Sequence, residues 1–153
     1  MIIDGKKVNY TLLESHLSQY IIKLMKTVVI CGSRRFKLEM RKFASKLKKL
    51  GVTVYEPYLH SGKEEWNGLS DAYKKFVALG LTHDHFYKIR MADVVYVYNK
   101  DGYSGNSTTL ELGYAVALGK PIFALSDKDD ELCRKVVFRD IVRSPNTLHK
   151  LLL

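Results

Sequence analysis

The residues with the clearest chemical potential in this chain lie in one stretch, Asp93 to Leu125. Within it, Glu111 follows Thr108 by three positions, and this spacing allows two interpretations. The pair could form a capping box, in which the glutamate bonds back to the backbone at the start of a helix. Alternatively, Glu111 could be a reactive carboxylate near a helix N-terminus, where it would stay ionised at neutral pH and act as a nucleophile. Spacing alone favours neither interpretation.

A carboxylate that attacks C1 of a sugar is the chemistry of retaining glycosidases, which form a covalent intermediate and use a second acid group. The candidates for that group precede the stretch. His85 can act as an acid or base near neutral pH, although it could equally be an ordinary polar helix residue. Asp93 could contact a ligand or cap the turn before a strand. His83, Asp84 and His85 do not share one helical face, so we expect no metal site.

Two glycine-containing loops could hold an anion. The loop at Gly105 leads into a helix whose first amides have no partner within the helix. The loop at Gly32 offers flexible backbone, a hydroxyl and guanidinium groups that can bind a phosphate with two bonds. Both glycines could instead only permit tight turns. Neither loop matches a P-loop or a GxGxxG fingerprint, so we expect neither an NTPase nor a dehydrogenase. The candidate substrate-binding residues are Gly32, Ser33, Arg34, Arg35, Asp93, Gly105, Asn106, Ser107 and Thr108.

The scaffold for these residues follows from the hydrophobic pattern. Buried strands are predicted at 27–31, 52–55, 94–98 and 121–125. Helical patterns lie between them, which predicts an α/β fold, a three-layer sandwich around a parallel sheet. In such a sheet ligands bind outside the carboxyl ends of the strands. We therefore expect the loops 32–36 and 100–107 to meet at one edge.

Several elements are defined less sharply. Residues 56–69 read as a long loop, which in a compact domain is usually functional or mobile. Helices are expected at 70–79 and 81–91, separated near Gly80, and at 108–118.

The remaining predictions concern the two ends of the chain. Residues 132–142 are ambiguous between helix and strand, and Ser144-Pro145 is a good start for a last helix. An amphipathic helix is expected at 11–25, so we divide the chain into an N-terminal helical extension, 1–26, and one domain, 27–153.

Composition sets limits on the class of protein. The chain has 153 residues and a formal net charge of +9, and eight basic residues with one acid lie between Arg34 and Lys49. The helix in this stretch has its own apolar stripe and no aromatic interleaving, so we expect a solvated face, with nucleic-acid binding by this face as a weaker alternative. No apolar run approaches the roughly 20 residues of a membrane span. With two cysteines, Cys31 and Cys133, and no secretion signal, we expect reduced thiols in a cytoplasmic protein.

Three segments together resemble the nucleoside 2-deoxyribosyltransferase-like proteins, which include 2′-deoxynucleoside 5′-monophosphate N-glycosidases and CMP hydrolases. They are CGS with Arg35, then ADVV at 92–95, and ELGYAVALGKP at 111–121, of which the last is the most specific. The resemblance covers about Thr27 to Leu125. It implies a flavodoxin- or Rossmann-like parallel sheet of about five strands, and a homodimer or higher homo-oligomer in which a neighbouring subunit completes the site.

The resemblance also implies a function. Glu111 matches the family nucleophile on the sugar C1, and the loops at Gly32 and Gly105 match those that contact the sugar-phosphate end. His85 stands where the N-glycosidases carry an aspartate. We therefore expect an enzyme, with no cofactor, that cleaves or transfers the base of a nucleoside or nucleoside 5′-monophosphate, as an N-glycosidase or deoxyribosyltransferase. The alternative is a nucleotide-binding or sensing module without turnover.

Overall fold

The structure is a computed structural model that describes residues 2–3, 6–7, 27–59 and 63–153. Its centre is a five-stranded, all-parallel sheet in the order β4-β3-β5-β6-β7. The strands are β3 (Thr27–Gly32), β4 (Thr53–Tyr55), β5 (Val94–Tyr98), β6 (Ile122–Ala124) and β7 (Asp140–Ile141). This order is that of doubly wound, flavodoxin-like folds. The predicted α/β class and five-stranded parallel sheet are confirmed.

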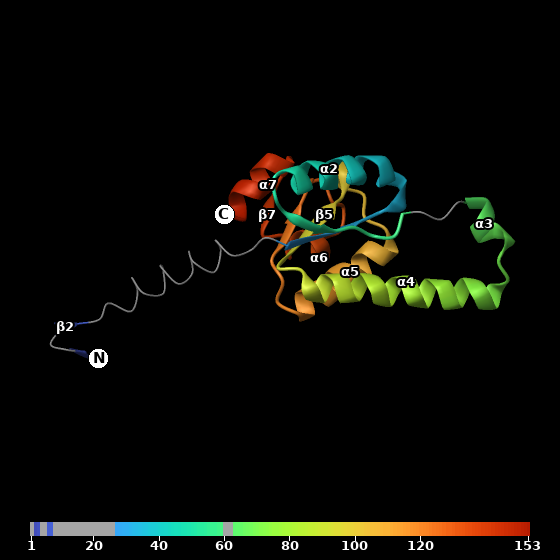
Figure 1. The fold of residues 1–153 in the computed structure, drawn as a ribbon, viewed down its shortest axis with the longest axis horizontal. Helices are drawn as coiled ribbons and strands as arrows, with labels where there is room; N and C mark the ends of the chain where they lie inside the picture. The colour runs from blue at the N-terminus through green and yellow to red at the C-terminus, as the bar shows by residue number, and fades with distance from the viewer. Residues whose placement is uncertain (1, 4–5, 8–26, 60–62) are drawn as a thin grey trace.

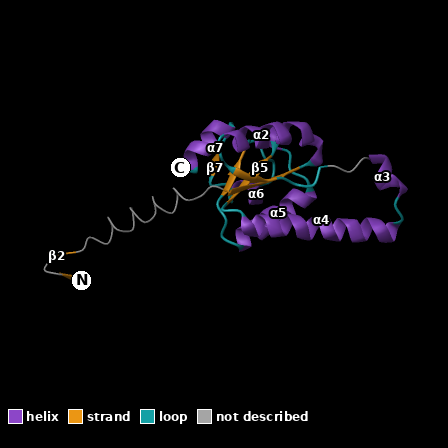
Figure 2. Ribbon diagram, viewed as in Figure 1, coloured by secondary structure: helices purple, strands orange, loops and turns teal. Residues whose placement is uncertain are grey.

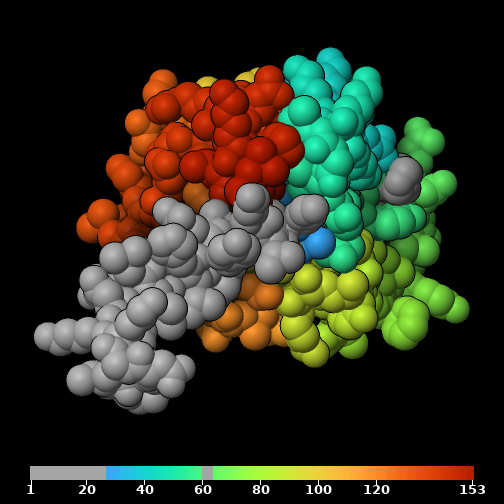
Figure 3. Space-filling model, turned by 60° about the vertical axis from the view of Figure 1, so that its left-hand side comes forward, coloured from blue at the N-terminus to red at the C-terminus, as the bar shows by residue number. Residues whose placement is uncertain are grey.

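Helices cover both faces of the sheet, so the domain has three layers (Figures 1 and 2). One layer contains α2 (Lys37–Lys49) and α7 (Pro145–Leu151), and the other contains α4 (Asp71–Met91) and α5 (Asn106–Ala117). Figure 3 shows α7 and α2 side by side on the outer surface. A separate antiparallel pair is formed by β1 (Ile2–Ile3) and β2 (Lys6–Lys7). The predicted helix at 11–25 lies outside the described residues.

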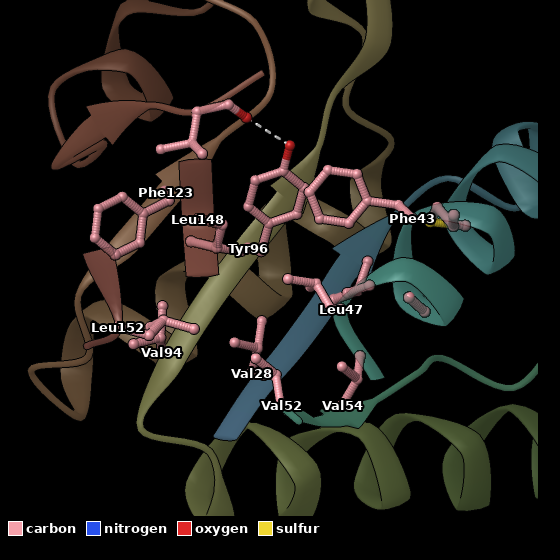
Figure 4. Close-up of a cluster of buried hydrophobic side chains, with 14 of the residues drawn as sticks. Val28, Phe43, Leu47, Val52, Val54, Val94, Tyr96, Phe123, Leu148 and Leu152 are labelled. Atoms are coloured by element: carbon pink, nitrogen blue, oxygen red, sulfur yellow. Dashed lines mark hydrogen bonds between the residues drawn. The ribbon is translucent and has the colours of Figure 1, made fainter. Parts of the chain in front are cut away.

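Alternation along the strands divides the core between the two layers. Val28 and Ile30 of β3 face α2 and α7, whereas Val29 and Cys31 face α4 and α5. On the first face, the ring of Tyr96 stacks on Phe43 at a centroid distance of 4.4 Å (Figure 4). The Tyr96 hydroxyl donates a hydrogen bond of 2.7 Å to the carbonyl oxygen of Val142, which satisfies the one polar group of this buried ring.

Some boundaries differ from those predicted. Helix α4 runs without a break through Gly80, because a single glycine inside a helix costs only about 1 kcal/mol. The predicted loop 56–69 contains a short helix, α3 (Lys63–Gly68). The ambiguous segment 132–142 contains both α6 (Leu132–Lys135) and β7, while Ser144 caps α7 as predicted. No helix in the described part of the chain is both long enough and apolar enough to cross a membrane.

Candidate active site

The loops after β3 and β5 meet at the carboxyl edge of the sheet, as the sequence predicts. Each begins with a single 3₁₀ turn, η1 (Arg34–Phe36) and η2 (Lys100–Gly102). The guanidinium carbon of Arg35 lies 3.5 Å from the ring centroid of Tyr103, and Phe36 packs edge-on against the same ring. Neighbouring strands whose connections leave toward opposite faces create the crevice in which such sheets bind ligands.

Beneath these loops, three side chains from three elements converge. Glu111 comes from α5, His85 from α4, and Cys31 from the end of β3. The Nε2 atom of His85 lies 3.6 Å from Oε2 of Glu111 and 3.4 Å from the Sγ atom of Cys31. Glu111 and His85, both predicted to be catalytic, are thus brought into contact.

This cluster is buried and poorly satisfied. His85 is 5% exposed and the Glu111 side chain 15%. Within the described part of the chain, neither Oε2 of Glu111 nor Nδ1 of His85 has a hydrogen-bond partner. Buried polar atoms are almost always paired, so two orphans in one cluster indicate a site built for something other than stability.

Burial also changes the protonation of the cluster. It raises the pKa of Glu111 to about 8 and lowers the pKa of His85 to about 4, because each group is more easily buried in its neutral form. The pKa of the Cys31 thiol is raised by the same burial and by the nearby Glu111. The sequence prediction of an ionised Glu111 is therefore wrong, because desolvation outweighs proximity to the helix N-terminus.

The capping-box interpretation of Glu111 is also wrong. Helix α5 begins at Asn106, two residues before the predicted start, with Gly105 as N-cap. Thr108 therefore lies inside the helix, and Glu111 is a turn and a half beyond its first residue. No side chain caps α5, so its first turn presents main-chain amides next to the loop.

The candidate anion-binding residues of the first loop lie in a constrained turn. Ser33 caps η1 by accepting a hydrogen bond from the amide of Arg35, 3.4 Å away. A Cβ atom at Gly32 would lie 2.8 Å from the sulfur of Met40 and 3.1 Å from the carbonyl oxygen of Tyr98. Glycine is therefore required where β3 passes close to β5 and α2.

One other predicted site residue, and one neighbour of His85 in the sequence, are placed elsewhere. Asp93 lies before β5, at the amino edge of the sheet, where it accepts hydrogen bonds from the amide and hydroxyl of Thr27. It joins the starts of two strands and is not near Glu111, since the two lie at opposite edges of the sheet. Asp84 pairs with Lys88 one turn along α4, at 2.6 Å, and is half exposed.

Sequence reasoning missed three residues that form or support this edge. Cys31 was assigned only to the core, although alternation along β3 places it on the α4–α5 face with Val29. The amide of Asn99, fully buried, bonds both the carbonyl oxygen and the amide of Ser126, and so ties the end of β5 to the end of β6. Its position directly after a buried strand was the available signal. Arg134 is the third.

Arg134 and the buried Asp129 hold the second loop. The guanidinium bonds both carboxylate oxygens of Asp129, at 2.7 to 3.0 Å, and reaches the hydroxyl of Thr109 on α5 at 3.3 Å. The hydroxyl of Ser104 adds a further hydrogen bond to Asp129. This network joins the loop that precedes α5 to the segment between β6 and α6.

A hollow of about 560 Å³ lies beside the segment that follows β4. It is lined by α2, by the segment after β4 and by Lys88 of α4, and it contains none of the three cluster residues. Two of the three cations that line it are in ion pairs, Lys48 with Glu56 at 2.5 Å and Lys88 with Asp84, and Arg41 donates a hydrogen bond to the carbonyl oxygen of Leu59. We therefore do not include this hollow in the candidate site.

Comparisons with known proteins agree with the resemblance found in the sequence. The family model for nucleoside 2-deoxyribosyltransferase matches residues 30–146. A 2-deoxyribosyltransferase from the psychrotolerant bacterium Bacillus psychrosaccharolyticus is similar in structure, with a TM-score of 0.56, 19% identity, and coverage of 80% of this chain and 90% of that one. A conserved protein from Enterococcus faecalis V583 gives a TM-score of 0.55 at 15% identity, over 84% and 97%. A search of curated proteins gave no match.

Proposed function

Because the chain belongs to the nucleoside 2-deoxyribosyltransferase family, we propose that it cleaves or transfers the base of a nucleoside 5′-monophosphate with Glu111 as the nucleophile. The observation that carries this proposal is the position of Glu111. It lies on α5, at the carboxyl edge of the sheet, with one carboxylate oxygen buried and not bonded to any described residue. The fold therefore does not use this oxygen for its own hydrogen bonding, which supports a role toward a substrate.

The proposed reaction has two steps. A carboxylate oxygen of Glu111 bonds to C1′ as the bond from C1′ to the base nitrogen breaks, and the electron pair leaves with the base, which takes up a proton. Water or a second base then attacks C1′ and frees Glu111. The proton that Glu111 loses before attack goes to the leaving base. His85, 3.6 Å from Glu111, is close enough to relay this proton, and because its pKa is lowered to about 4 it passes the proton on rather than holding it.

A phosphorylated substrate is supported by the charge and backbone of the two loops. Arg34 and Arg35 follow β3 directly, and the first turn of α5 presents amides that no side chain caps. A helix N-terminus together with guanidinium groups is a common anion site. The proposed phosphate and sugar contacts are Gly32, Ser33, Arg34, Arg35, Gly105, Asn106, Ser107 and Thr108.

A panel of nucleosides and their 5′-monophosphates, in ribose and deoxyribose forms, tests the proposal. Free base is followed by chromatography, with and without a second base as acceptor. We expect release from at least one monophosphate, and a loss of about 10³-fold or more in Glu111→Gln. The matched control is Glu131→Gln, an exposed residue at the start of α6, which should leave the rate unchanged. Tight binding of monophosphates without any release would identify a sensing module instead.

A homodimer is part of the same proposal. The first half of α4 extends beyond the sheet toward α3 (Figure 1) and exposes Tyr73, Phe76 and Leu79 by 64%, 73% and 59%. Such a row of large apolar side chains is typical of a subunit interface. Sedimentation should show a dimer that Phe76→Glu dissociates, whereas Leu132→Glu, on α6, should not. A monomeric wild-type protein at micromolar concentration would contradict this.

A further inference from the structure

The cluster of Cys31, His85 and Glu111 carries three different metal-binding atoms. Sγ of Cys31, Nε2 of His85 and a carboxylate oxygen of Glu111 all lie within 4.8 Å of one another. The distance from Nε2 to Sγ is 3.4 Å, and that from Nε2 to Oε2 of Glu111 is 3.6 Å. Cys31 and His85 are far apart in the sequence, so only the fold brings these atoms together.

The two distances from Nε2 of His85 match those between neighbouring ligands in a tetrahedral zinc site, and the third pair of atoms lies within 4.8 Å. Zinc bonds of about 2.3 Å to sulfur, 2.0–2.1 Å to nitrogen and 2.0–2.2 Å to oxygen place neighbouring ligand atoms about 3.3–3.6 Å apart. A thiolate, an imidazole and one carboxylate favour zinc and similar borderline ions over magnesium or calcium, which prefer oxygen ligands.

The site is also held in advance of binding. Its three ligands come from a central strand and two helices, whose backbones are fixed by the sheet and by packing of α4 against α5 through the stacked rings of Phe86 and Tyr114. His85 is almost fully buried with Nε2 directed into the cluster, and Oε2 of Glu111 has no donor among the residues that the structure describes. Ligands on rigid elements need little rearrangement to bind an ion.

We infer that Cys31, His85 and Glu111 bind one zinc-type divalent ion, with a fourth position left for water. Binding releases two protons to solvent, one from the Cys31 thiol and one from the Glu111 carboxyl, while neutral His85 binds through Nε2. The bound ion blocks the Glu111 carboxylate, which is the group that attacks the sugar in the proposed reaction. If the proposed function holds, zinc is therefore a reversible inhibitor that competes with substrate.

Cobalt(II) tests binding without any substrate. The purified full-length protein, stripped with a chelator, is titrated with Co²⁺ and followed by absorption spectroscopy. We expect one ion per chain, with the thiolate-to-cobalt charge-transfer band and the visible bands of tetrahedral coordination, all displaced by Zn²⁺.

Variants assign the ligands. Cys31→Ser should abolish the charge-transfer band, and His85→Ala should weaken affinity by more than about 100-fold, beyond the effect of losing an outer-shell partner. Cys133→Ser, which alters the exposed second cysteine, should change nothing. A band that survives Cys31→Ser, or that disappears in Cys133→Ser, overturns the assignment, as does the absence of a band in the folded wild-type protein.

Inhibition is measured separately. If the protein releases base, Zn²⁺ should raise the apparent KM and a chelator should restore it, and inhibition that persists unchanged in Cys31→Ser contradicts the metal site as its cause. If no base is released from any substrate, the proposed function fails, but the cobalt spectrum still decides whether the ion binds.

Discussion

Two buried carboxylates at the same edge of the sheet differ in almost every respect. Asp129 is 3% exposed and accepts hydrogen bonds from Arg134, from the Glu131 amide and from Ser104. Glu111 has one oxygen with no partner in the described chain and a neutral histidine beside it.

The pKa values of the two groups move in opposite directions. For Asp129, burial opposes ionisation, but the hydrogen bonds from Arg134 and the Glu131 amide outweigh it, so the pKa is lowered. For Glu111, burial has no comparable opponent, and the pKa rises to about 8. One carboxylate therefore stabilises the fold, whereas the other is held in the fold at a cost.

Removing the charge of Asp129 should produce the largest change in stability. Asp129→Asn leaves the guanidinium of Arg134, 11% exposed, without its buried partner and with only the exposed Asp130 as a counter-charge. We expect a loss of about 4 kcal/mol in the free energy of unfolding at pH 7. Because the folded pKa of Asp129 is lowered, this difference should disappear as pH falls through and below about 4. Urea denaturation at several pH values measures both.

The control for Asp129 is a surface pair. Asp127 lies 3.3 Å from Arg143, with both side chains more than 60% exposed. Asp127→Asn should change stability by less than about 0.5 kcal/mol. Equal effects of the two substitutions would contradict the structural role given to Asp129.

Glu111→Gln should act in the opposite direction and increase stability. A group whose pKa is raised in the folded protein binds more protons folded than unfolded, so the wild-type protein loses stability as pH rises from about 4.5 to 8. The glutamine cannot ionise, so the variant should be more stable by about 3 kcal/mol at pH 8 and nearly equal to wild type at pH 5. A variant less stable than wild type at pH 8 would mean that the carboxylate is satisfied after all.

The smallest effect concerns the contact between the two loops. Tyr103→Leu removes the ring beneath the guanidinium of Arg35, a contact worth about 0.5–1 kcal/mol at an exposed site. We expect KM for a 5′-monophosphate to rise about 2- to 5-fold, with little change for the free nucleoside. Tyr103→Phe keeps the ring and should behave as wild type. An equal rise in KM for the 5′-monophosphate and the free nucleoside would show that this contact does not act on phosphate binding.

The fold could be predicted because its signals are local. The apolar runs of β3 and β5 and the serine–proline start of α7 each depend on a few neighbouring residues. Two local signals misled. Helix α4 continues through the exposed Gly80, because one glycine costs a helix only about 1 kcal/mol, and α5 begins at Asn106, before Thr108, with Gly105 as its N-cap.

The site was predicted only in part, because its properties depend on burial. The family resemblance made Glu111 and His85 the catalytic candidates, but the raised pKa of Glu111 comes from desolvation that only the packed fold creates. The approach of Cys31 depends on which face of β3 carries α4 and α5, and a single sequence does not specify that layer. Asp93 was assigned to the site because it is close in sequence to the loop that follows β5. Asp93 precedes β5, however, and the two ends of this strand lie at opposite edges of the sheet.

The most direct test of the account is to trap the covalent intermediate. Wild-type protein is mixed with a 5′-monophosphate substrate, quenched in acid during turnover, digested and analysed by mass spectrometry. We expect an ester between the Glu111 carboxylate and C1 of a pentose 5-phosphate on the peptide that contains Glu111, and no such adduct in Glu111→Gln. Rapid base release with the sugar attached to another residue, or with no adduct under conditions where the intermediate should accumulate, would contradict it.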